Sequence, residues 1–131
     1  MSWVNWYLLA WNRTFEINGR SRRKEFGYFF LVTALLALVL LGVGVAFGPN
    51  EALTTARIRV SMGLYLAVVI VPKSTLTIRR LHDVEISGWL FLLGLVPFAG
   101  LVLDMFCLLT DSNPMPNKWG ISPKFEDVVG P

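Results

Sequence analysis

Cysteine, histidine and charged residues are scarce in this chain. It holds one cysteine, one histidine and only 16% charged residues in 131. A single cysteine excludes an internal disulfide, and a single histidine excludes a metal site built from several histidines of one chain. Soluble domains contain roughly a quarter charged residues. The scarcity of charge therefore excludes an ordinary soluble globule, and the high apolar content excludes a disordered chain.

The chain is instead rich in apolar residues, which make up 54% of it and give a mean hydropathy of +0.56. Twelve Lys and Arg against nine Asp and Glu give a net charge of +3. The basic residues stand beside long apolar runs, as on the cytoplasmic flanks of membrane spans. We therefore expect one integral membrane domain over residues 1–131, with neither a nucleic-acid partner nor a cofactor.

Three apolar segments predict an all-α membrane bundle over residues 26–110. The first, residues 26–47, has no charge over twenty-two residues, which is about 33 Å of helix and enough to cross a bilayer. A polar loop then leads to a second span over residues 60–78, with a kink expected at Pro72. Residues 86–110 form the third segment.

The two ends of the chain differ from this bundle. Residues 1–25 carry three of the five tryptophans and an apolar stripe at helical spacing: Val4, Tyr7, Leu8, Trp11 and Phe15. This pattern predicts an amphipathic helix at the membrane interface, or a helix packed against the bundle. Residues 111–131 are polar with four prolines, which predicts an extended, largely unstructured tail.

The third apolar segment permits two topologies. It is either one kinked span or a hairpin broken between Pro97 and Gly100. Each half of a hairpin is only about 18 Å long, too short to cross alone. A hairpin would nevertheless bring Lys73 and Asp104 to similar depth, where these two intramembrane charges can pair.

The distribution of basic residues predicts the orientation in the membrane. With the N-terminus inside, three spans place eight basic residues inside and four outside, and the hairpin places ten inside and two outside. Both counts predict a multi-pass protein with a cytoplasmic N-terminus.

A basic turn precedes the first span and contains Arg20, Arg22, Arg23 and Lys24. Each Lys or Arg near the surface gains about 1 kcal/mol from anionic lipid. Within the turn, Gly19 permits positive φ, and Ser21 could cap the helix that comes after it. The turn is therefore either a topology signal or a contact for anionic headgroups or an acidic partner.

A second polar cluster precedes the third segment and contains Arg79, Arg80, His82 and Asp83. On a helix, Asp83 can pair with either arginine. With the N-terminus inside, Glu25 could pair with Arg79 or Arg80 and tie the two clusters together. We expect this structural ion-pair network, or an anionic-ligand site that includes Arg79, Arg80 and His82.

Three motifs give the chain a likeness to a known family. They are Trp6-Tyr7 with residues 19–26 (GRSRRKEF), residues 79–83 (RRLHD) with Ser87-Gly88-Trp89, and residues 117–120 (NKWG). With these motifs the chain resembles the YhaH/YhaI-like family of small bacterial inner-membrane proteins, a domain of unknown function. The resemblance implies an integral protein of a bacterial inner membrane and implies no activity.

These observations favour a non-enzymatic accessory or structural subunit that binds a larger membrane protein or lipid. The alternative is a homo-oligomeric channel or transporter subunit that uses Lys73 and Asp104. Catalysis is not expected, because Ser87, His82 and Asp83 lack the geometry of a nucleophile elbow.

Overall fold

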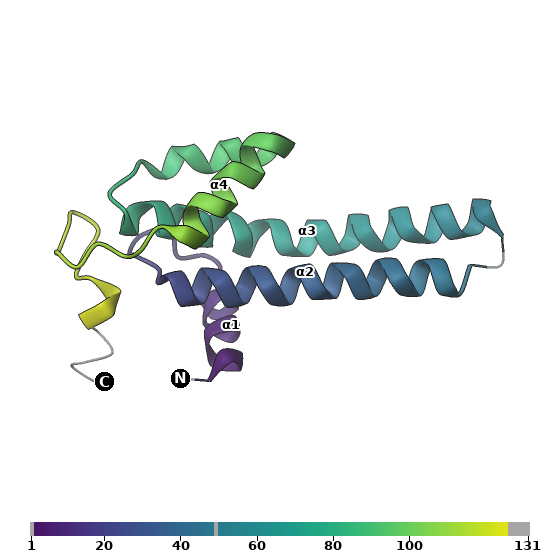
Figure 1. Cartoon of the computed structure of the whole chain (residues 1–131), viewed down its shortest axis with the longest axis horizontal. Coiled ribbons are helices and arrows are strands. Elements are labelled where there is room, and N and C mark those ends of the chain that lie inside the picture. The colour runs from purple at the N-terminus through teal and green to yellow at the C-terminus, as the bar shows by residue number, and fades with distance from the viewer. Residues whose placement is uncertain (1, 49, 126–131) are drawn as a thin grey trace.

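The computed structural model describes residues 2–48 and 50–125. Five helical elements succeed one another along these residues (Figure 1): α1 (Trp3–Asn12), α2 (Arg23–Ala46), α3 (Glu51–Asp83), η1 (Gly88–Leu95) and α4 (Pro97–Leu109). Helices α2 and α3 form a long antiparallel pair, and the other elements lie at the end where α2 begins and α3 ends. We call this the proximal end, and the opposite end, at the α2–α3 loop, the distal end.

Among the described residues, α2 and α3 are the two helices long and apolar enough to cross a membrane. Helix α3 begins nine residues earlier than residue 60 because the predicted polar loop is helical from Glu51 onward. The Asn50 side chain accepts a hydrogen bond from the backbone N–H of Leu53 at 3.0 Å and so caps this helix. The helix also continues through Pro72.

The third apolar segment is not a single span. It consists of the 3₁₀ helix η1, eight residues long, and the thirteen-residue α4, which folds back beside it (Figure 1). Pro97 disfavours helical geometry at Val96, which is extended (φ −97°, ψ 119°). A Cβ on Gly100 would lie 3.1 Å from the carbonyl oxygen of Gly94, so glycine permits the close approach of the two arms. Of the two predicted topologies, the described structure has the broken hairpin.

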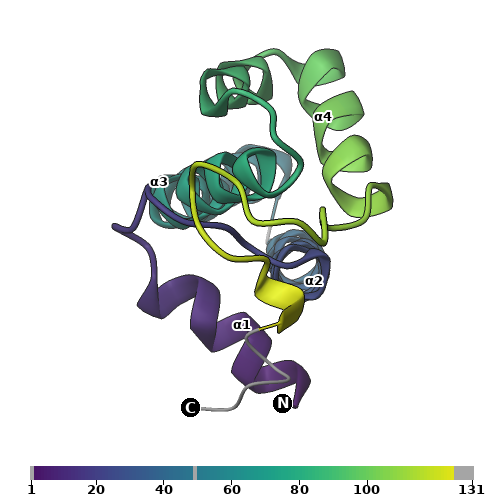
Figure 2. The ribbon, with the colours of Figure 1, turned by 90° about the vertical axis from the view of Figure 1, so that its left-hand side faces the viewer.

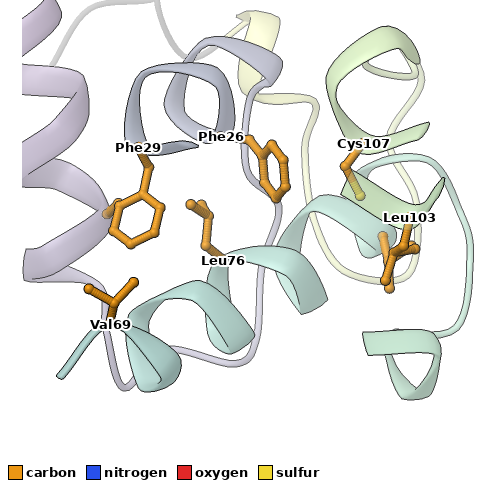
Figure 3. Close-up of a cluster of buried hydrophobic side chains, with 8 residues drawn as sticks. Phe26, Phe29, Val69, Leu76, Leu103 and Cys107 are labelled. Carbon is orange, nitrogen blue, oxygen red and sulfur yellow. The ribbon is translucent and has the colours of Figure 1, made fainter. Parts of the chain in front are cut away.

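The apolar core lies at the proximal end (Figure 3). Phe26 and Phe29 of α2 meet Val69 and Leu76 of α3, and α4 adds Leu103 and Cys107. The buried residues of α2 end at Thr33 and those of α3 begin at Val69, in two helices that the structure describes completely. We therefore call residues 23–33 and 69–83 the proximal half of the pair, and residues 34–46 and 51–68 the distal half.

Helix α1 packs on α2 through a face that shares Tyr7 and Trp11 with the predicted stripe but is centred beside it. Trp6 and Ala10 are its buried residues, and Tyr7 stacks on Phe29 with ring centroids 5.9 Å apart. Phe15 is 89% exposed. The buried face runs through Trp6 and Ala10, four residues apart, because these side chains meet α2 and the turn before it.

The C-terminal tail is folded as far as residue 125, contrary to the predicted extended tail. An isolated bridge joins Asn117 to Gly120, and Ser122 is fully buried. Figure 2 shows the tail crossing the proximal end, over the start of α2 and the end of α3. Prolines disfavour a long helix in this segment, where only the turn over residues 123–125 is helical, but they do not prevent it from docking. Residues 126–131 of the predicted tail lie outside the described residues.

Candidate functional site: a buried charge cluster at the proximal end

The central group of the proximal end is the carboxylate of Asp83, the last residue of α3. Its Oδ1 accepts from Arg20 Nε at 2.9 Å, and its Oδ2 accepts from Arg80 Nη1. The three side chains are at most 2% exposed. One carboxylate therefore holds two buried guanidinium groups, one from the turn before α2 and one from α3 itself.

Arg80 also holds the end of α4. Its Nε donates to the carbonyl of Cys107 at 3.0 Å, and its Nη2 donates to the carbonyl of Thr110. Carbonyls at a helix C-terminus lack partners within the helix. Arg80 supplies donors to them, so this side chain attaches the end of the hairpin's return arm to α3.

Arg20 holds the tail in the same way. Its guanidinium donates to the carbonyls of Met115 at 2.8 Å, Asn113 at 2.5 Å and Gly120 at 3.4 Å. Gly19, just before it, has a positive φ of 101°, which confirms the turn predicted there. The interaction of Arg20 with Asp83 and the tail was not predicted, because 63 and more residues separate the partners in sequence.

A second buried pair lies beside the first. Arg79 Nη2 is 3.2 Å from Glu25 Oε1, and Ser21 Oγ donates to Glu25 Oε2 at 2.5 Å. Glu25 therefore pairs with Arg79, one of the two partners that the sequence permitted. Ser21 does not cap α2; the N-cap residue is Arg22, whose side chain makes no capping hydrogen bond to the helix. Within the described residues, Arg79 Nε and Nη1 have no hydrogen-bond partner.

His82 connects this cluster to the tail. Its ring stacks on Trp119 with centroids 4.3 Å apart and planes 10° from parallel, and its carbonyl accepts from Asn117 Nδ2 at 3.0 Å. A Cβ on Gly88 would lie 2.8 Å from His82 Nε2, so only glycine fits against the ring. The motifs that are far apart in sequence therefore meet at the proximal end.

The structure corrects part of the predicted lipid contact. Arg20, Arg79, Arg80 and His82 are 0–7% exposed and are committed to protein partners. They are buried because carboxylates and backbone carbonyls satisfy their charge, so they do not form a lipid-facing surface. Of the predicted contact residues, Arg22 is half-buried, with its guanidinium 5.7 Å from the Trp6 ring, while Arg23 and Lys24 are exposed.

The two charges predicted to lie within the membrane are brought together, as the hairpin alternative predicted. Lys73 Nζ of α3 lies 2.9 Å from Asp104 Oδ2 of α4. The Asp104 side chain is 7% exposed and that of Lys73 is 41% exposed. This pair is a second polar link between α3 and the return arm, deeper along α3 than Arg80.

Two apolar helices of spanning length, joined at one end by buried ion pairs, are the features of a helical integral membrane protein. Residues 14–121 match the family described as "Protein of unknown function (DUF805)", and the chain belongs to that family. No solved structure matches the chain.

Two proteins from Escherichia coli strain K12 are similar to this chain over nearly their whole length. The chain is 31% identical to the inner membrane protein YhaI over 122 residues, which are 93% of this chain and 98% of YhaI. It is 32% identical to the inner membrane protein YhaH over 128 residues, 94% of this chain and 99% of YhaH. The predicted family is confirmed, and the chain is a bacterial inner-membrane protein whose family has no assigned function.

Proposed function

We propose that the protein is a non-enzymatic accessory subunit that docks on a larger membrane protein. In this proposal α2 and α3 span the membrane and the proximal end faces the cytoplasm. Both described ends of the chain lie at the proximal end (Figure 1), and at the distal end Arg57 and Arg59 are basic residues next to the loop. The excess of basic residues at the proximal end supports this orientation.

The observation that carries the proposal is the exposure of η1. Eight residues of 3₁₀ helix rise about 16 Å and thirteen of α-helix about 20 Å, so the hairpin reaches little more than half the roughly 30 Å of a bilayer core. None of the described residues of η1 is buried. Irregular backbone at membrane depth is tolerated only where protein covers it or where it lines a water-filled cavity. A protein partner over η1 would provide that cover.

The buried polar groups support a structural rather than a catalytic role. Asp83, Arg80 and Arg20 are each bound to protein groups on more than one side, and His82 stacks on Trp119. These contacts hold the turn, the hairpin and the tail in one arrangement. A subunit that binds a partner through η1 requires the segments around η1 to be held rigidly in this way.

The test uses a photo-crosslinking amino acid in place of Leu93 of η1, with Leu38 of the distal half as the matched control. Both side chains are exposed, at 41% and 64%. We expect Leu93 to crosslink to one larger membrane protein in cells and Leu38 to give no protein product. Native mass spectrometry of the complex, purified with its lipids, should show that protein in fixed stoichiometry.

Two outcomes would overturn the proposal. A monomer with lipid alone, and no protein crosslink from Leu93, would remove the need for a partner. A homo-oligomer without a second protein would support the alternative channel subunit. In that case the next measurement is ion flux through the wild type and through the Lys73→Leu and Asp104→Leu variants. Intramembrane charges often mark ion paths, so loss of flux in the variants would support the channel.

A further inference from the structure

A groove of about 640 Å³ runs between α2 and the end of α4 at the proximal end. Three segments far apart in sequence line it: the first turns of α2, the end of α4, and the tail through Asp111, Ser112 and Lys124. Its volume lies within the roughly 300–1,000 Å³ of small-molecule sites in proteins. The groove is separate from the η1 face, so a ligand bound in it does not require a protein partner on η1.

The mouth and the floor of the groove differ in chemistry. Basic residues stand at its mouth, namely Arg22, Arg23, Lys24 and Lys124, and Asp111 is the one acidic lining residue among those that the structure describes. Lys124 Nζ lies 2.7 Å from Asp111 Oδ2 and neutralises it. Arg23 and Lys24 are exposed. The described residues of the mouth therefore carry an excess of positive charge.

Beyond the basic mouth the groove is apolar. Tyr28, Phe30 and Leu31 of α2 line it together with Leu108 of α4. From residue 23 to residue 31 the helix rises about 12 Å. Gly27 keeps the floor open, because a Cβ there would lie 3.8 Å from Leu108 Cδ2 and a larger side chain would fill the space.

We propose that this groove is a binding site for an anionic phospholipid of the cytoplasmic leaflet. The phosphate headgroup lies at Arg23 and Lys24, and an acyl chain lies over Gly27 and Leu31 against Leu108. The combination of a cationic mouth and an apolar floor matches a molecule with an anionic head and an apolar chain. A soluble anion leaves the apolar floor in contact with water, and an uncharged apolar molecule makes no use of the basic mouth.

The experiment titrates the intact, delipidated protein in a neutral detergent with phosphatidylglycerol and, separately, with phosphatidylcholine of the same acyl chains. Native mass spectrometry reports the affinity of the first bound lipid. We expect the wild type to prefer phosphatidylglycerol. The double variant Arg23→Gln/Lys24→Gln should lose roughly 30-fold in affinity for it, about 2 kcal/mol for two surface charges, with little change for phosphatidylcholine.

Two further variants separate the site from general attraction. Lys118→Gln removes one basic residue of the tail that does not line this groove, and it should leave the affinity for phosphatidylglycerol within about twofold. Gly27→Leu keeps every charge and fills the floor, and it should weaken binding of phosphatidylglycerol at least tenfold. Both basic residues replaced in the double variant are exposed, so that variant should keep the helical content of the wild type by circular dichroism.

Three results would overturn the proposal. The first is equal affinity of the wild type for the two lipids. The second is a loss in Lys118→Gln as large as that in the double variant, which would mean that net charge alone attracts the lipid. The third is displacement of phosphatidylglycerol by glycerol 3-phosphate at similar concentration, which would mean that the apolar floor contributes nothing.

Discussion

The two halves of the α2–α3 pair belong to the same two continuous helices but are held in different ways. In the proximal half, apolar side chains are buried and ion pairs fix the neighbouring turn, hairpin and tail. In the distal half no side chain is buried, and the helices meet at a few close contacts. Lipid is as apolar as leucine, so apolar burial does not drive helices together in a membrane. The ion pairs, rather than apolar burial, therefore fix how the helices and the tail are arranged in the proximal half.

The largest effect is expected from Asp83→Ala. The change leaves Arg20 and Arg80 buried without their carboxylate, and breaking a buried ion pair costs about 3–5 kcal/mol. Unfolding of the purified protein by SDS in mixed micelles measures the free energy. Arg13→Gln is the control, because it breaks the exposed pair with Glu16 and should cost less than about 1 kcal/mol. Equal losses in the two variants would contradict the importance of the proximal cluster.

Glu25 and Arg79 provide a second, smaller test of the proximal half. Glu25→Leu leaves Arg79 buried with no partner for its charge, and we expect a loss of about 2–4 kcal/mol. The double variant Glu25→Leu/Arg79→Met replaces the pair by apolar groups and should recover most of that loss in the same SDS assay. Additive losses in the double variant would mean that the two residues act independently.

Gly44 tests the distal half. A Cβ on Gly44 would lie 2.6 Å from Ile58 Cγ1, so Gly44→Ala forces α2 and α3 apart and should cost about 1–3 kcal/mol. Gly42→Ala is the matched control in the same helix, because a Cβ there meets nothing within 4 Å. If both variants are neutral, the distal half lacks close helix packing.

The smallest effect concerns the exposed pair of Asp111 and Lys124. The hydrogen bond from Lys124 lowers the pKa of Asp111. The pair therefore stabilises the fold above the unfolded carboxyl pKa of about 3.9, and this contribution is lost as the pH falls through the folded pKa. It should be less than about 0.5 kcal/mol and weaker in salt. Comparing Asp111→Asn with the wild type at pH 7 and pH 3 measures it, and a larger loss would mean that the tail contributes more than one surface pair.

Sequence reasoning succeeded best where the information was local. The uncharged run of α2, the positive φ at Gly19 and the break at Pro97 depend on residues next to one another. The pairs of Glu25 with Arg79 and of Lys73 with Asp104 were among the alternatives, because opposite charges at similar depth in a membrane are expected to meet. The stripe predicted for α1 was right for Tyr7 and Trp11 but missed Trp6 and Ala10, since an apolar stripe does not say which side meets the bundle.

The apolar runs, the charge pattern and the motifs by themselves determined that this chain is a helical membrane protein of a known family, because segment length and hydropathy are properties of the chain. Only the tertiary structure decided that Arg20 holds both Asp83 and the tail, that Arg80 holds the end of α4, and that Arg23 and Lys24 remain at the mouth of a groove. The physical reason is that a basic residue has the same sequence signature whether it faces lipid or a buried carboxylate. Its partner is chosen by which segments the fold brings within hydrogen-bonding distance.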